Sequence, residues 1–125
     1  MCEPTVIIAN YKKKKYKVIV VSSAMSGVTN ELIKKSSEIS KNFSNSEHDV
    51  LVSSGEQIAC SLIAGRLVHK KFKSRSWISW QVPIITVGSH KNARINQIYK
   101  NRIIKYLKDV VGVCYQSPCA DWELK

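Results

Sequence analysis

The segment from Val18 to Leu32 constrains the fold of this chain more than any other. Its first four residues, Val18 to Val21, are all β-branched and have no polar alternation, which predicts a strand buried on both faces of a sheet. Small and hydroxylated residues follow, and Thr29 and Asn30 favour the N-cap of a helix that begins near Glu31. A strand, a small-residue turn and a helix N-terminus together present backbone N–H groups to a carboxylate or a phosphate.

The same turn is also compatible with a protein that binds nothing there. Glycine and serine are common in strand-to-helix turns of α/β proteins, so both interpretations stay open on these residues alone. Neither the GxGxxG fingerprint of dinucleotide-binding proteins nor the GxxxxGK(S/T) phosphate loop follows the strand. The segment therefore indicates an anion-binding turn without naming the anion.

Apolar periodicity and turn residues predict the order of the other elements. The short apolar segment Val6–Ala9 fits either the end of a helix or an edge strand. Beyond it strands and helices alternate, which predicts a layered α/β fold with a mostly parallel sheet. The expected strands are Lys17–Ala24, Asp49–Ser53, Ser76–Trp80, Ile84–Val87 and Val110–Tyr115. The expected helices are Asn30–Ser40, Gly55–Phe72 and Ala93–Lys108, with a loop at Lys41–His48.

The formal net charge of +11 allows a nucleic-acid-binding module as one interpretation. The densest basic run is Lys12–Lys15, and a second basic group spans Lys70–Arg75. Lysine, isoleucine, asparagine and serine are all abundant, however, a bias that raises charge without any function. The lysines also fall in expected loops and on helix exteriors, so solvated charge is the favoured interpretation and nucleic acid is not an expected partner.

The remaining composition favours one cytoplasmic domain without a metal site. A chain of 125 residues is at most one domain, or a part of one, and no apolar run is long enough to cross a bilayer. The apolar residues of the N-terminus precede its charges, the reverse of a secretory signal. The four cysteines lack C-x-x-C spacing and the three histidines are scattered, so we expect free thiols and no metal ligands.

Two motifs carry a resemblance to a known family. The segment VSSAMSGVTNEL resembles the VSAMxGVTN segment of aspartate kinases, which belong to the amino-acid kinase superfamily. The segment Asp49–Leu67 is similar to the "D…LSxGE" segment of the same family, and Ser79–Val87 is a weaker third match. The two stronger motifs occur in the family's order, and the resemblance covers roughly Lys17 to Asp109.

The resemblance implies a fold, a reaction and a set of ligands. The fold would be a partial three-layer αβα sandwich of the amino-acid kinase type. The reaction would be ATP-dependent phosphorylation of the side-chain carboxylate of L-aspartate to 4-phospho-L-aspartate, with Mg²⁺ accompanying ATP. This reaction is the first step towards lysine, threonine and methionine. Catalysis of this kind depends mainly on positioning and charge neutralisation.

The resemblance also implies which residues would hold L-aspartate. Thr29 matches the threonine that contacts a substrate carboxylate, and Glu56 matches the glutamate that binds the α-amino group. Ser23 and Gly27 would line the turn and bring backbone N–H groups towards aspartate or the transferred phosphate. Gly55 would let the backbone approach closely, so that Glu56 faces the site. A plain helix cap for Thr29 and a helix-dipole partner for Glu56 are the structural alternatives.

Other family motifs have no match in this chain. The KFGG(S/T)S segment, whose lysine neutralises phosphate charge, is absent, and so are the GRGGSD-type and TDVDGV-like segments that hold substrate and nucleotide. No catalytic or nucleotide-binding residue is therefore assigned. We expect a basic segment at 1–16, an incomplete kinase-like domain at 17–116 and an unmatched tail at 117–125. A truncated or split kinase, or a non-catalytic aspartate-binding chain that needs a complementary chain or a second copy, fits these observations.

Overall fold

The computed structural model describes residues 4–14, 16–78, 81–88, 93–107 and 110–115. The tail at 117–125 and the end of the expected strand Ser76–Trp80 lie outside these ranges. Within them, helices and strands alternate only in part. The helices are α1 (Pro4–Lys13), α2 (Val28–Ile39), α3 (Asn45–His69) and α4 (Asn101–Tyr106). The strands are β1 (Ile19–Ser22), β2 (Ser74–Trp77), β3 (Ile84–Val87), β4 (Arg94–Ile98) and β5 (Val111–Tyr115).

A three-stranded parallel sheet lies at the centre of the described chain. Its strand order is β1-β5-β2, so the last strand in sequence lies between the first two. Ile19 of β1 and Arg75 of β2 both pair with Gly112 of β5. The predicted strands at Lys17–Ala24, Ser76–Trp80 and Val110–Tyr115 are confirmed in shortened or shifted form.

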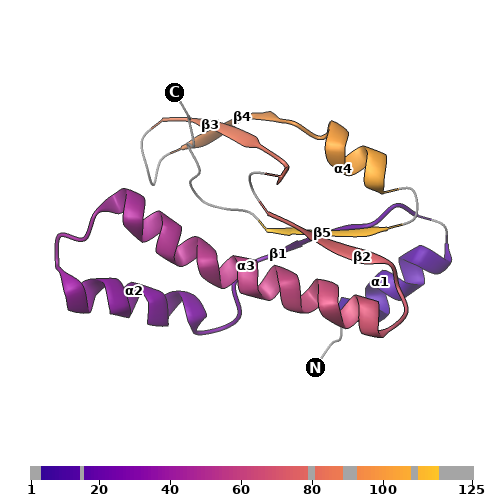
Figure 1. The fold of residues 1–125 in the computed structure, drawn as a ribbon, viewed down its shortest axis with the longest axis horizontal. Coiled ribbons are helices and arrows are strands. Elements are labelled where there is room, and N and C mark those ends of the chain that lie inside the picture. Colours follow the sequence, from indigo (N-terminus) through magenta and orange to yellow (C-terminus); the bar gives the residue numbers. More distant parts are fainter. Residues whose placement is uncertain (1–3, 15, 79–80, 89–92, 108–109, 116–125) are drawn as a thin grey trace.

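Helices cover the sheet unequally on its two sides. Figure 1 shows α1 and α3 on one side of the sheet, with α2 alongside α3, and α4 with the β3–β4 hairpin on the other. This arrangement has helix, sheet and helix layers, so the predicted αβα class with a parallel sheet is confirmed. No helix in the described ranges is both long enough and apolar enough to span a membrane.

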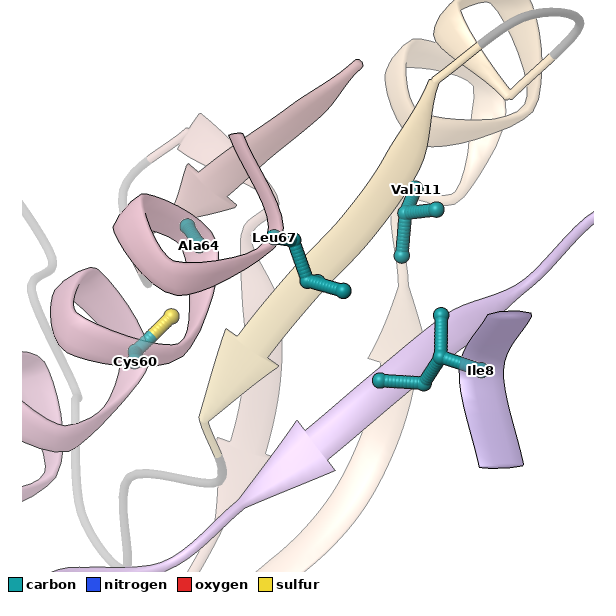
Figure 2. Packing of buried hydrophobic residues seen from close by; sticks show 5 residues of the cluster. All are labelled: Ile8, Cys60, Ala64, Leu67 and Val111. Carbon is teal, nitrogen blue, oxygen red and sulfur yellow. The ribbon is translucent and has the colours of Figure 1, made fainter. Parts of the chain in front are cut away.

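The core on the α1 and α3 side is small and well buried. Figure 2 shows Cys60, Ala64 and Leu67 of α3 with Val111 of β5 and Ile8 of α1. Leu67 and Val111 have no solvent-accessible surface. Because Ile8 belongs to this cluster, the segment Val6–Ala9, which the sequence left open between helix and strand, is part of helix α1 and helps to close the core.

The predicted strand at Asp49–Ser53 is wrong, because these residues belong to the 25-residue helix α3. Only Ser54 separates them from the predicted helix that begins at Gly55, and no proline lies between them. The hydroxyls of Ser53 and Ser54 donate to the carbonyls of Val50 and Leu51, at 2.8 and 2.7 Å, and so their polarity is satisfied inside the helix. The expected loop at Lys41–His48 is correspondingly shorter, since α3 begins at Asn45.

The predicted helix Ala93–Lys108 is also wrong over its first half. Residues Arg94–Ile98 form β4, which pairs antiparallel with β3 and places Ile98 opposite Ile84. Among the described residues of this segment, Asn101–Tyr106 are the helical ones. The apolar residues at helical spacing fit a helix locally, but pairing with β3 gives the same backbone groups hydrogen-bond partners in a hairpin. The expected strand Ile84–Val87 is confirmed with its predicted bounds.

Strand β1 is not buried on both faces, which corrects the interpretation of Val18–Val21. Val18 and Val20 pack against the core, whereas Ile19 and Val21 are 46% and 64% exposed. The two sets alternate along the strand, so they lie on opposite faces of the sheet. An unbroken run of β-branched residues therefore marks a strand here without marking which of its faces is covered.

Candidate functional site

The turn between β1 and α2 supplies an open helix N-terminus. Helix α2 begins at Val28, and its N-cap is Gly27 in the left-handed conformation with φ of 84°, so the predicted capping by Thr29 or Asn30 is wrong. Glycine tolerates this conformation, which lets the chain turn directly from the strand into the helix. The amide of Val28 donates to Met25 and that of Glu31 donates to Gly27, at 3.1 and 3.0 Å.

The first turn of α2 retains hydrogen-bonding capacity. No side chain in the described ranges caps the helix, and the backbone N–H groups of Thr29 and Asn30 have no acceptor there. Thr29 is half-buried and carries a hydroxyl in addition to one of these donors. Uncapped N–H groups and the helix dipole make this end of α2 attractive to a carboxylate or phosphate oxygen.

Gly55 brings the middle of α3 against this turn. A Cβ atom at Gly55 would lie 2.9 Å from Cγ1 of Val28, 3.3 Å from Cδ1 of Leu32 and 3.4 Å from Cβ of Ala24. A distance of 2.9 Å is shorter than the contacts that real Cβ atoms make, so only glycine fits here without a shift. Gly55 therefore sets the close approach of α3 to the residues on either side of Gly27.

Glu56, the next residue of α3, carries a buried and unsatisfied oxygen. Its Oε2 atom is inaccessible to solvent and has no hydrogen-bond partner among the described residues. Burial raises the pKa of the Glu56 carboxyl above its ordinary value of 4.5, because desolvation disfavours the charged form. A buried acceptor without a donor costs free energy, and a cationic ligand would remove that cost.

Asp49 is a residue that the sequence analysis did not select for the site. It is 8% exposed and lies seven residues before Glu56, on the same face of α3. Its Oδ1 atom is 3.9 Å from Nδ1 of His48. The incorrect strand at Asp49–Ser53 concealed this relation, because strand geometry does not place Asp49 and Glu56 on one helical face. The separation of seven residues between Asp49 and Glu56, which is about two helical turns, would have revealed their shared face if one longer helix had been predicted.

The five residues predicted for the site lie on two neighbouring elements. Ser23, Gly27 and Thr29 lie in or beside the β1–α2 turn, and Gly55 and Glu56 lie in α3 where it packs against that turn. Ser23 is exposed, and its carbonyl accepts a hydrogen bond from the Ser22 hydroxyl at 3.0 Å. The first turn of α2 offers donors for an anion, and Glu56 of α3 offers an acceptor for a cation.

The described residues contain no cluster of side chains that could bind a metal ion. Within these ranges no three side chains of histidine, cysteine, aspartate or glutamate gather closely enough to hold an ion. Cys60, which the sequence places on an apolar stretch, is buried as a free thiol. Burial raises the pKa of the Cys60 thiol, and a hydrogen bond with the backbone of Trp77 partly offsets this effect.

Comparison with known proteins gives one family for most of the chain. The profile of the amino acid kinase family matches residues 5–120. An aspartokinase of Rickettsia conorii is 41% identical over 105 residues, which are 82% of this chain and 26% of that protein. Aspartokinase 2 of Bacillus subtilis is 35% identical over 116 residues, 90% of this chain and 28% of that protein. The chain thus spans about a quarter of the length of these relatives.

A solved structure shares the fold. The crystal structure of aspartate kinase from Synechocystis matches with a TM-score of 0.71 and 23% sequence identity. The match covers 90% of this chain and 18% of that one. The described arrangement of helices and strands is therefore similar to that of part of this solved structure.

Proposed function

This chain belongs to the amino acid kinase family, and from that membership we propose that it binds L-aspartate as the aspartate-holding part of an aspartate kinase. The proposed ligand carries one ammonium and two carboxylate groups. The sequence relatives named as aspartokinases, at 35 to 41% identity, support the choice of aspartate among amino acids.

The buried Oε2 atom of Glu56 is the observation that carries this proposal. An α-ammonium group would supply the donor that Oε2 lacks and would favour the ionised carboxylate. A carboxylate of the same ligand would accept from the uncapped N–H groups and the hydroxyl at Thr29. Gly27 and Gly55 would act indirectly, since Gly27 allows the turn into α2 and Gly55 allows the close packing of α3 against the residues beside that turn.

The described residues do not form a site for ATP and Mg²⁺ by themselves. They include no acidic cluster suited to a divalent cation, and the sequence lacks the family's phosphate-neutralising and nucleotide-binding segments. When bound, ATP would supply the γ-phosphoryl group that is transferred to aspartate. The role that we propose for this chain is confined to binding the amino acid and orienting its side-chain carboxylate.

A role in the phosphorylation of aspartate would make the chain part of amino-acid biosynthesis in the cytoplasm. The product would be 4-phospho-L-aspartate, a precursor of lysine, threonine and methionine. This placement rests on membership of the family and on the names of the relatives.

A comparison of L-aspartate with succinate tests the proposed site. Succinate retains both carboxylates but lacks the ammonium group. The unsubstituted chain should therefore bind L-aspartate at least about tenfold more tightly than succinate, because the free energy of one charge-assisted hydrogen bond corresponds to an affinity ratio of this size. Glu56→Gln should abolish that preference in isothermal titration calorimetry. Equal affinities of the unsubstituted chain for both ligands would contradict the assignment of Glu56.

A second candidate is a non-catalytic aspartate-binding chain that requires a complementary chain. The exposed apolar side chains of Ile19 and Val21 on β1 favour it, since they leave one face of the sheet partly uncovered. The two candidates differ in turnover. ATP-dependent formation of 4-phospho-L-aspartate, trapped with hydroxylamine and lost in Glu56→Ala, would support the kinase, and binding without turnover would support the second candidate.

A further inference from the structure

A cavity on the other side of the sheet is not explained by the proposed aspartate site. It has a volume of about 400 Å³ and lies between β2 and α4. This volume is within the range of small-molecule sites. Two cationic side chains, two aromatic rings and one amide line it, namely Arg75, Lys105, Trp77, Tyr106 and Gln81.

The aromatic side chains hold Arg75 in place. The Cζ atom of Arg75 lies 4.8 Å from the ring centroid of Trp77 and 5.7 Å from that of Tyr106, within reach of cation–π attraction. The two rings are 5.2 Å apart and tilted by 59°. Trp77 is buried and packs in a cluster with Val82 and Leu107. The ring against which Arg75 stacks is therefore held in place by core packing.

The positive charges at this cavity are not neutralised by the described residues. Neither Arg75 nor Lys105 forms an ion pair with any carboxylate in those ranges. The Oε1 atom of Gln81 accepts from the amide of Ile78 at 3.1 Å, which leaves its Nε2 group as a further donor. The net charge of +11 adds a field that attracts anions to such a cavity.

We propose that this cavity binds a small phosphorylated metabolite with a planar ring. A phosphate monoester carries close to two negative charges, which matches the guanidinium of Arg75 and the ammonium of Lys105. The half-exposed ring of Tyr106 offers a flat wall for the organic group. Figure 1 shows α4 and α3 on opposite sides of the sheet, so this cavity is separate from Glu56.

Phenyl phosphate, inorganic phosphate and phenol are the probes that test the proposal. In low-salt titration calorimetry with the full chain, phenyl phosphate should bind more tightly than inorganic phosphate, and phenol should bind weakly. Arg75→Gln should weaken phenyl phosphate binding by about tenfold, since it removes a charge-assisted donor pair. Lys105 is exposed, so Lys105→Gln should weaken binding without disturbing the fold.

Two control variants make the result decisive. Lys34→Gln removes the same charge from an exposed residue of α2 and should leave binding unchanged. Glu56→Gln should also leave it unchanged, which distinguishes this site from the aspartate site. The proposal would be overturned by an absence of saturable binding, by equal losses in Lys105→Gln and Lys34→Gln, or by loss of phenyl phosphate binding in Glu56→Gln.

Discussion

The buried carboxyl of Glu56 is costly for stability, and in the proposed site it is the group that accepts from the ammonium of the ligand. Its Oε2 atom is buried without a donor in the described part of the chain, and burial raises the pKa of its carboxyl. The folded protein therefore favours the protonated form, while an ammonium ligand would favour the ionised form. Unfavourable local energetics of this kind are common at ligand sites.

The raised pKa of Glu56 predicts a specific dependence of stability on pH. A carboxyl whose pKa is higher in the folded state than in the unfolded state binds the proton more strongly when folded. Its contribution to the free energy of unfolding is complete below the ordinary value of 4.5 and is lost as pH rises through the raised pKa. Glu56→Gln should remove this loss, so the variant should be the more stable protein at neutral pH.

Urea unfolding of both proteins from about pH 4 to pH 7 measures this effect. The stability difference between Glu56→Gln and the unsubstituted chain should grow in favour of the variant as pH rises. Glu47→Gln alters an exposed glutamate of the same helix and is the matched control. A constant difference across the pH range for Glu56→Gln would refute the burial argument.

Helix α3 is the element that links the core to the candidate site. Its Cys60, Ala64 and Leu67 pack in the core, while Gly55, earlier in the same helix, packs against the residues beside the β1–α2 turn, and Glu56 follows it directly. A single continuous helix therefore couples the position of Glu56 to the packing of the sheet. Two glycines of α3 test this coupling because their surroundings differ.

Gly55→Ala and Gly65→Ala should have opposite effects on stability. A Cβ at Gly55 would overlap Val28, a clash that typically costs about 1–3 kcal/mol, reduced by the better helix propensity of alanine. A Cβ at Gly65 meets nothing within 4 Å, so the same substitution there should stabilise the protein by up to about 1 kcal/mol. Denaturant midpoints of the two variants provide the measurement. A stabilising Gly55→Ala would disprove the close packing of α3 on the turn.

At the scale of the whole molecule, the described chain buries a small core and exposes many apolar side chains. Leu67, Val111 and Cys60 are the largest side chains that are fully buried, whereas Ile19 and Val21 of an edge strand remain exposed. Parallel sheets are normally covered on both faces, and uncovered edges favour association. Uncovered apolar surface of this kind favours marginal stability, aggregation or dependence on another chain.

We therefore predict that the chain self-associates through the exposed face of β1. Sedimentation velocity of the unsubstituted chain should show concentration-dependent species larger than the 14.1 kDa monomer. The double substitution Ile19→Thr and Val21→Thr should reduce them, because it lowers the apolar area at the edge strand. Ile39→Thr, at a 75% exposed position at the end of α2, is the control and should have little effect. Monomeric behaviour of the unsubstituted chain at all concentrations would contradict this prediction.

Local sequence determined the strands β1, β3 and β5, the helices around Leu32 and Leu67, and the family of the chain. These features depend on short-range patterns: runs of β-branched residues indicate strands, apolar residues at helical spacing indicate helices, and two short motifs indicate the family. Tertiary structure decided the rest. Pairing with β3 makes Arg94–Ile98 a strand despite its helical spacing, and helix continuity absorbs Asp49–Ser53. The covered face of β1 and the buried environment of Glu56 depend on which elements pack there, and contacts between residues distant in sequence set both.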